Sequence, residues 1–362
     1  MASSRPFETR EASSSMMRKY AVRLFIAPAS ILLAARTAAA QDTSRVAPSA
    51  LFASDAPLEM TIRTDIRTLL RDRGEERSDH DGIAKVARPG GAFDSVSIEL
   101  RTRGIFRRRP TVCAFPPLRL SIGRRAGRNT IFEGERRIKL VTHCRNTDQY
   151  EQYVLQEYLI YKVYALLTDL SLRTRLARVT YEDAAGREKP VTRYAILIED
   201  EDRLAARQRM RVVEDTGTHI SRLDPAQTVF MAVFQYFVGN TDWSIRALHN
   251  IITLADSTGR ILPVPYDFDW AGVIATRYAA PDTSLPIKSV KERLYSGYCG
   301  SIEDFEPIFA RFRQHRAAIE ALYDLEPLDR DDRERARRYY ADFYRLIDDP
   351  SRVRREMLKA CP

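Results

Sequence analysis

Beyond its first forty residues, the 362-residue sequence lacks any apolar segment long enough to cross a membrane. It also lacks internal repeats and low-complexity tracts, which excludes a solenoid or a fibrous protein. The four cysteines do not have the spacing of a zinc site. What remains is an ordinary globular composition, 44% hydrophobic and 30% charged, in a chain long enough for one large domain or a two-lobed one.

The first forty residues have the layout of a secretory signal peptide. Its basic start, apolar stretch and small-residue cleavage site are Arg18, Lys19 and Arg23, then Leu24 to Ala35, then Ala38-Ala39-Ala40. We therefore expect a signal peptide over 1–40, a linker over 41–57, and a periplasmic or secreted mature protein with no membrane span. A retained membrane anchor is the alternative, and a true start at Met16 or Met17 also stays open.

Export affects the interpretation of the charge and of the cysteines. Without residues 1–40, the 58 basic and 49 acidic side chains become 52 and 47, which lowers the net charge from +9 to +5. That excess is too small to indicate nucleic-acid binding. In an oxidising compartment the cysteines would form disulfides. We favour Cys113 with Cys144 and Cys299 with Cys361, while free buried thiols remain equally compatible with the sequence.

The hydrophobic pattern changes along the chain from strand-like to helical, which predicts an α+β protein. Strand-like segments are expected at 58–63, 95–103, 118–122, 136–141, 175–181 and 191–198, with a loop over 71–88 and a helix over 148–170. A buried helix should follow the cap Asp224-Pro225 and end at Gly239, before a hairpin formed by 251–254 and 261–264. We expect a β-rich part over 58–200 and a mostly helical part over 201–362.

The densest group of chemically unusual residues surrounds that hairpin. Asp242 follows the buried helix, Asn250 lies at the mouth of the hairpin, and Asp267 and Asp269 follow its second strand. Phosphoryl transfer needs a carboxylate that takes the proton of the acceptor hydroxyl, and amide and carboxylate oxygens that hold Mg²⁺ against the phosphates. The order of these residues therefore predicts a catalytic Asp242 and metal ligands from Asn250 and Asp267, with Asp269 sharing or taking the metal role.

The β-rich part offers a partner for these residues. Lys139 lies in the strand over 136–141, and Glu157 lies on the buried stripe of the following helix. A buried carboxylate needs a partner, and kinases use a Lys–Glu pair to grip nucleotide phosphates. We therefore expect a Lys139–Glu157 pair; an ordinary ion pair at a helix–sheet contact is the alternative.

Together, Lys139, Glu157, the Asn240-Thr241-Asp242…His249-Asn250 loop and Pro265-Tyr266-Asp267-Phe268-Asp269 resemble the atypical kinases of the spore coat protein H (CotH) family. They are more distantly similar to HipA-type and phosphatidylinositol kinases. The resemblance covers about Ser95 to Ala271. It implies a two-lobed, protein-kinase-like fold with ATP and Mg²⁺ between a β-rich N-lobe and a helical C-lobe, and a hinge at Ile198 and Glu199 that binds adenine.

The sequence departs from this pattern because it has no GxGxxG phosphate loop, and its region 101–145 carries thirteen basic and two acidic residues. Arg107-Arg108-Arg109 either replaces the glycine loop as a phosphate clamp or belongs to a solvated basic face. Asp242 and Asn250 also suit ordinary turns. His249 is expected to be a buried structural partner of the loop.

The leading functional hypothesis is an exported kinase that transfers the γ-phosphoryl group of ATP to a hydroxyl of an extracytoplasmic protein. A small-molecule, sugar or lipid acceptor is a second possibility. Because ATP is scarce outside the cytoplasm, the alternative is a weakly active or inactive binding or scaffold protein of the cell envelope.

Overall fold

Seven strands with alternating inward and outward side chains close into a β-barrel. The computed structural model describes residues 49–88, 92–214, 220–297 and 301–358. The strands are β1 (Leu58–Thr64), β2 (His80–Ala87), β3 (Phe93–Thr102), β4 (Leu118–Ile122), β5 (Arg137–Val141), β6 (Thr174–Asp183) and β7 (Val191–Ile198). Their order around the barrel is β1-β2-β3-β4-β5-β7-β6. The barrel closes where β1 runs parallel to β6, with Leu58 opposite Ala177.

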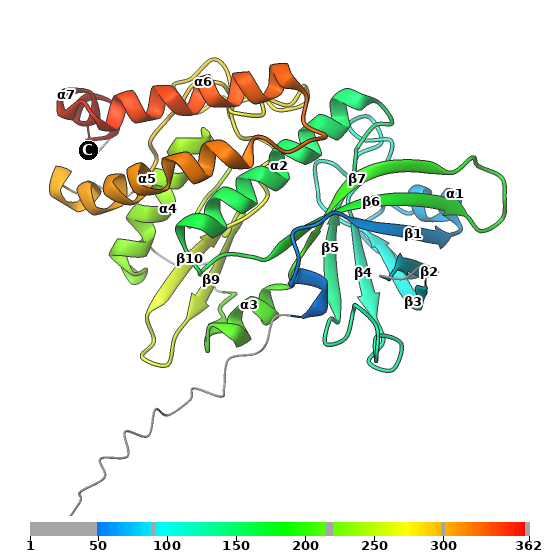
Figure 1. Cartoon of the computed structure of the whole chain (residues 1–362). Coiled ribbons are helices and arrows are strands. Elements are labelled where there is room, and N and C mark those ends of the chain that lie inside the picture. Colours follow the sequence, from blue (N-terminus) through cyan, green and yellow to red (C-terminus); the bar gives the residue numbers. More distant parts are fainter. Residues whose placement is uncertain (1–48, 89–91, 215–219, 298–300, 359–362) are drawn as a thin grey trace, which may run out of the picture. The chain divides into compact units, whose positions relative to one another are not determined.

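Helices and a second sheet make up most of the remaining structure (Figure 1). The helices are α1 (Ile66–Arg71), α2 (Asp148–Leu167), α3 (Glu201–Arg207), α4 (Pro225–Val238), α5 (Ile302–Leu322), α6 (Arg330–Ile347) and α7 (Pro350–Val353), with short turns η1 (Ala50–Phe52), η2 (Ile220–Arg222) and η3 (Arg354–Leu358). The small sheet has the order β10 (Ile261–Pro265), β9 (Ile251–Ala255), β8 (Arg211–Val212).

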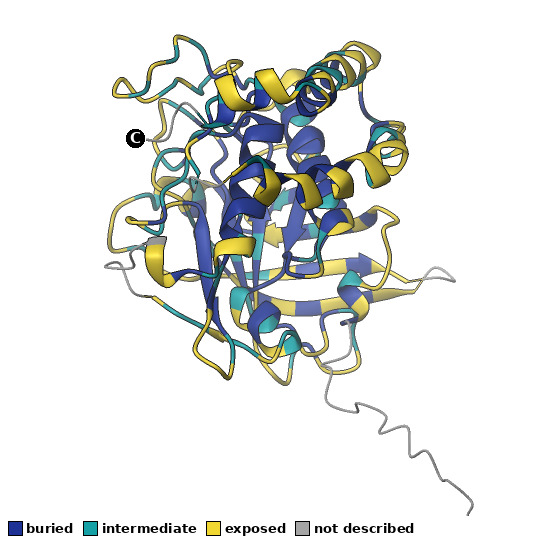
Figure 2. Ribbon diagram, turned by 90° about the vertical axis from the view of Figure 1, so that its left-hand side faces the viewer, coloured by how far each residue is buried: buried dark blue, intermediate teal, exposed yellow. Residues whose placement is uncertain are grey.

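Helix α2 joins the barrel to the helical part of the protein. It packs against β6 and β7 on one side and against α5 on another, while α4 packs against β10 and α5. Most side chains of α2 and α4 are buried, and in Figure 2 the buried residues concentrate where helices and sheets meet. Because one continuous apolar core surrounds α2 and α4, these two helices are firm supports for the loops that follow them.

Local signals in the sequence set the ends of α4, which leads into the candidate site. The Asp224 carboxylate accepts the backbone N–H of Gln227, and Pro225 occupies the first turn. The helix ends at Gly239, whose φ of 70° is in the left-handed region that glycine adopts without strain. The expected helix and the hairpin of β9 and β10 are therefore confirmed.

The expected two-lobed, protein-kinase-like fold is wrong. The protein instead has a closed seven-strand mixed barrel, a small three-strand sheet and helices α1 to α7. The described residues form one compact unit. Two features produced the error. The segment over 80–87, expected to be a loop, forms β2. Its alternating pattern is weak in the sequence because its inward positions include the small residues Gly82 and Ala84. The β1–β6 pairing, which closes the barrel, joins segments too far apart in sequence for a local pattern to reveal.

The predictions for the N-terminus and the cysteines are tested only in part by the described residues. The expected signal peptide and residues 41–48 of the expected linker lie outside the described residues, as do Cys299 and Cys361. Of the described remainder of the linker, Leu51 is buried and its carbonyl accepts a hydrogen bond from Arg175, while 53–57 are exposed. The Cys113–Cys144 disulfide is confirmed. Within the described ranges, no helix combines the length and apolarity that crossing a membrane requires.

Candidate functional site

One cleft of about 320 Å³ brings together the polar residues that the sequence singled out. Three segments line it: the turn after β3, the loop between α4 and β9, and the turn after β10. The lining residues are Ile105, Phe106, Arg107, Asp242, His249, Asn250, Tyr266, Asp267, Asp269 and Trp270. The predicted catalytic carboxylate and the three predicted metal ligands therefore share a single cavity.

Both carboxylate oxygens of Asp242 accept hydrogen bonds. His249 Nε2 lies 3.0 Å from Oδ1, and Asn250 Nδ2 lies 3.1 Å from Oδ2 and 2.7 Å from the Asp242 carbonyl oxygen. The hydrogen bond to Asp242 raises the pKa of His249, which burial opposes. The side chain of His249 is 52% exposed, so its expected burial is wrong, although its expected contact with the loop is present. Asp242 is consequently fixed in orientation while remaining partly open to the cleft.

The backbone at two of these residues adopts a conformation that non-glycine residues seldom take. Asn250 has a φ of 55° and Asp267 a φ of 61°. Asn and Asp tolerate this left-handed region better than other side chains do, and strained backbone often marks functional sites. The Asp267 N–H donates to the buried Tyr161 hydroxyl of α2 at 2.8 Å, and the Tyr266 N–H donates to the Asn250 carbonyl at 3.0 Å. These bonds hold the two residues in place.

Arg107 occupies the middle of the carboxylates, in a role that the sequence did not reveal. Its guanidinium lies 2.6 Å from Asp267, 3.2 Å from Asp269 and 3.5 Å from Glu157, and the residue is 7% exposed. Although burial opposes it, the charges of Asp269, Asp267 and Glu157 raise the pKa of Arg107. Arg107 therefore does not belong to a solvated basic face. The run of three arginines was the only signal in the sequence.

One guanidinium does not balance the carboxylates around it. Glu157 is 1% exposed, and its Oε1 has no hydrogen-bond partner within the described part of the chain. Burial raises the pKa of Glu157 to about 8, against the opposing effect of Arg107. Burial likewise raises the pKa of Asp269 to about 7, although Arg107 and the hydroxyl of Tyr278 lower it. A cluster with this excess of negative charge favours a further proton or cation.

The raised pKa of Glu157 predicts a specific loss of stability with pH. The pKa of Glu157 in the folded state is about 8, above its ordinary value of 4.5, so the folded state holds the proton more tightly than the unfolded state does. The stability that this proton contributes is therefore complete below pH 4.5 and is lost as the pH rises through 8. The Glu157→Gln variant should be more stable than the wild type at pH 8, by roughly 1–3 kcal/mol, and closely similar to it at pH 5.

Urea unfolding at a series of pH values measures this difference. The exposed carboxylate of Glu334 provides the matched control, since Glu334→Gln should leave the wild-type pH dependence unchanged. A Glu157→Gln variant that loses stability in parallel with the wild type between pH 6.5 and 8 would show that this carboxyl is already ionised.

Lys139 does not form the expected pair with Glu157. Its Nζ lies 2.6 Å from Glu201 of α3 and 5.0 Å from the ring centroid of Tyr266. Ile138 and Leu140 point into the barrel, so Lys139 faces outward, toward α3 rather than toward Glu157 on α2. Sequence spacing gave the correct face of the strand but not the partner. Lys139 is therefore next to the cleft through Tyr266, which lines it.

The expected hinge is buried and occupied by other bonds. Ile198 lies in β7 opposite Lys139 of β5 and Thr174 of β6. The Glu199 N–H donates to the Arg173 carbonyl at 2.9 Å, and its carboxylate accepts from the Arg173 N–H and from Arg207. The Glu199 side chain therefore ties the end of β7 to α3.

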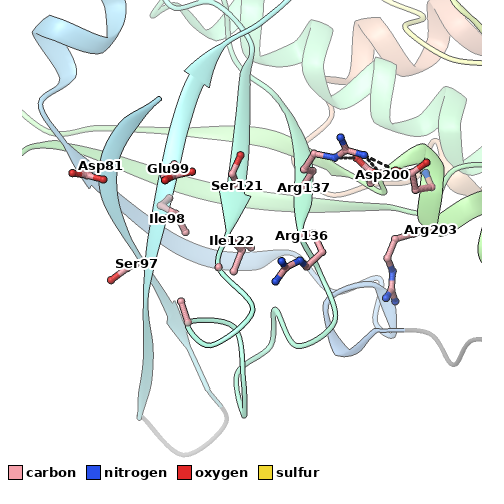
Figure 3. A pocket seen from close by; sticks show the side chains of 13 residues that line it. Asp81, Ser97, Ile98, Glu99, Ser121, Ile122, Arg136, Arg137, Asp200 and Arg203 are labelled. Carbon is pink, nitrogen blue, oxygen red and sulfur yellow. Dashed lines mark hydrogen bonds and ion pairs between the residues drawn. The ribbon is translucent and has the colours of Figure 1, made fainter. Parts of the chain in front are cut away.

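A second cavity of about 610 Å³ lies beside this segment, against the outer face of the barrel (Figure 3). Its side chains come from β2 to β5 and from the start of α3, and they include Ser97, Glu99, Ser121, Arg136 and Arg203. Arg137 of β5 is bonded to Asp200 at 3.0 Å across one side of it. Lys139 contacts Tyr266, which lines the first cleft, and Glu201, which follows Asp200 of the second cavity. Lys139 therefore lies between the two cavities.

No protein-family model matches this chain, and a search of the curated proteins finds no match either. The resemblance to the spore coat protein H family therefore depends on the site residues alone.

The donor set of the cleft fits a magnesium ion that takes several ligands from water and phosphate. Among the residues with described positions, no three His, Cys, Asp or Glu side chains are grouped to hold a metal by themselves. Magnesium, however, usually keeps several waters and needs only one or two protein oxygens. Since Asn250 donates through Nδ2 to Asp242, its amide oxygen stays available as an acceptor, and only one oxygen of Asp267 is bonded to Arg107. Asn250 and Asp267 are thus the residues suited to such an ion.

Proposed function

We propose that this protein is an exported phosphotransferase that moves the γ-phosphoryl group of a nucleoside triphosphate, ATP in the first instance, to a hydroxyl of an acceptor outside the cytoplasm. The observation that carries the proposal is the shared cleft of Asp242, Asn250 and Asp267. Phosphoryl transfer depends on positioning and charge stabilisation more than on covalent chemistry, and these three residues supply both.

Each residue has a distinct task in the reaction. Asp242 accepts the proton of the acceptor hydroxyl, whose oxygen forms a bond to the γ-phosphorus while the bond to the bridging oxygen breaks and the nucleoside diphosphate leaves. His249 and Asn250 orient Asp242 through the hydrogen bonds to its two oxygens. Asn250 and Asp267 hold Mg²⁺, with Asp269 beside them. A bound magnesium ion neutralises charge on the phosphates.

The second cavity supports a location for the nucleotide. Arg136 lines it and is suited to phosphate or ribose oxygens, while Arg137 is paired with Asp200 and Arg203 with Glu135. Lys139 lies between this cavity and the cleft, as a phosphate-binding residue should. In this arrangement the base of the nucleotide lies toward Asp200 and the γ-phosphate toward Asp267. The side chain of Glu199 supports the end of β7 and does not touch the nucleotide.

The Cys113–Cys144 disulfide supports an extracytoplasmic location, because structural disulfides persist in oxidising compartments. The acceptor class that fits such a location best is a protein hydroxyl. Together with the expected signal peptide, the disulfide is the basis for placing the protein in the periplasm or the external medium.

A second candidate function is binding without catalysis, and Arg107 favours it. Its contacts with Asp267 and Asp269 place a permanent positive charge where a metal ion would otherwise be attracted. A chain that binds nucleotide or acceptor but transfers no phosphate would act as a scaffold of the cell envelope.

The proposal is tested with the purified protein, γ-labelled ATP and Mg²⁺, with and without added acceptor proteins. We expect incorporation of label into the protein itself or an acceptor, and its loss in Asp267→Asn, which removes a metal ligand. The matched control Asp282→Asn changes an exposed carboxylate outside the cleft and should retain the activity. Nucleotide-dependent thermal stabilisation without any transfer would support the scaffold function, and absence of both would overturn the proposal.

A further inference from the structure

A third cavity, of about 360 Å³, lies between α1 and one end of the barrel and shares no residue with the candidate site. Its volume is within the range of small-molecule sites, which are about 300–1,000 Å³. Apolar side chains from four parts of the chain line it: Ile66 and Leu70 of α1, Phe115, Tyr181 of β6 and Val191 of β7. A cavity of this composition suits a ligand with an apolar body.

Aromatic rings form one wall of this cavity and continue behind it. The Phe115 ring lies 4.5 Å from that of Tyr181 and 4.8 Å from that of His143, centroid to centroid. The Cys113–Cys144 disulfide secures this wall, because the Phe115 N–H donates to the Cys144 carbonyl at 2.8 Å. The wall is thus rigid and presents flat aromatic surface, against which an aromatic ring packs well.

Two buried polar atoms of the aromatic wall are left without partners. The Tyr181 hydroxyl and His143 Nδ1 have no hydrogen-bond partner among the residues that the structure describes, and the two residues are 3% and 2% exposed. Buried polar atoms are nearly always bonded, and leaving one unbonded costs about 1–3 kcal/mol. Neither atom has appreciable accessible surface, so a ligand in the cavity would meet the ring of Tyr181 and not its hydroxyl.

The rim of the cavity carries unpaired positive charge. Arg67 is paired with Glu188, and Asp183 is paired with Arg187, so these charges are already balanced. The two other rim cations, those of Arg71 and Lys189, form no ion pair within the described ranges. A ligand with a carboxylate would complement them.

We propose that this cavity binds a small aromatic carboxylate. The ring packs against Leu70, Phe115 and Tyr181, and the carboxylate lies at Arg71 and Lys189. The proposal is independent of the phosphotransferase function, because none of these residues touches the candidate site.

The probe for this site is phenylacetate. Binding to the full chain is measured by saturation-transfer NMR and calorimetry. We expect saturable binding of one molecule, weakened about tenfold when Arg71→Gln and Lys189→Gln are combined, since each lost charged contact removes part of the binding free energy. The matched control, Arg124→Gln with Arg125→Gln, removes two exposed charges elsewhere and should leave binding unchanged.

A further variant separates binding in the cavity from binding at the surface. Leu70→Trp fills the cavity and should abolish binding. The Asp267→Asn variant should bind the probe normally, whether or not it transfers phosphate. Absence of saturable binding by the wild type, or binding that both Leu70→Trp and the Arg71/Lys189 pair leave unchanged, would overturn the proposal.

Discussion

Replacing Asp242 by asparagine will lower kcat for phosphoryl transfer by roughly a thousandfold, because general-base contributions are typically 10²–10⁴. The amide has nearly the same shape as the carboxylate but cannot take the proton of the acceptor hydroxyl. It also presents an N–H₂ group to one of the two donors, His249 Nε2 and Asn250 Nδ2, that now bond the carboxylate. The KM for ATP should change little, since Asp242 is not a metal ligand in the proposed reaction.

The measurement is initial-rate kinetics at saturating ATP and Mg²⁺. His249→Gln keeps a hydrogen-bond donor beside Asp242 and should lower kcat by only about tenfold, consistent with a positioning residue. It should also move the pH profile of kcat/KM, because the hydrogen bond between these two residues raises the pKa of His249. A rate for Asp242→Asn within a few-fold of the wild type would remove Asp242 from the reaction.

Replacing Arg107 by methionine will lower the free energy of unfolding by about 3–5 kcal/mol, the range observed when one partner of a buried ion pair is removed. The variant leaves Glu157, Asp267 and Asp269 together without their cation. Their mutual repulsion in a buried setting is the physical cause of the loss. Methionine fills a similar volume, so a cavity is not the main effect.

Urea unfolding with and without Mg²⁺ measures this prediction and its consequence for the site. Magnesium should stabilise Arg107→Met more than the wild type, because the three carboxylates no longer bond a guanidinium. The control Arg109→Met alters an exposed arginine two residues away, which lies over the ring of Phe106, and should cost less than about 1 kcal/mol. A variant that is as stable as the wild type would mean that Arg107 does not neutralise the cluster.

Local patterns in the sequence predicted most individual elements correctly. The strand over 118–122 has the expected bounds, and the helix begins at Asp148 as expected but ends at Leu167, three residues early. The hairpin of β9 and β10 brings Asp267 back to Asn250 as anticipated. These successes share one cause, since periodicity, caps and turns act over a few residues. The convergence of Asp242, Asn250 and Asp267 followed from the same local order.

Contacts between distant segments could not be predicted in this way. Arg107 and Asp267 are 160 residues apart, and nothing in either neighbourhood indicates the other. Lys139 has two carboxylates within reach of its strand, and only the tertiary arrangement selects Glu201 rather than Glu157. The kinase-like fold was inferred from a resemblance over about Ser95 to Ala271, and it was wrong because the closure of the barrel also needs β1 and β2, which precede that range.

The parallel contact between β1 and β6 has a consequence for biosynthesis. Leu58 cannot pair with Ala177 until about 120 further residues have left the ribosome. The edge of β1 that pairs with β6 therefore stays unpaired while the intervening strands are synthesised. Exposed strand edges pair readily with other chains, and long-range pairings form slowly. The nascent chain should therefore depend on a chaperone until β6 is available, and truncation anywhere before residue 174 should yield an aggregating product rather than a smaller barrel.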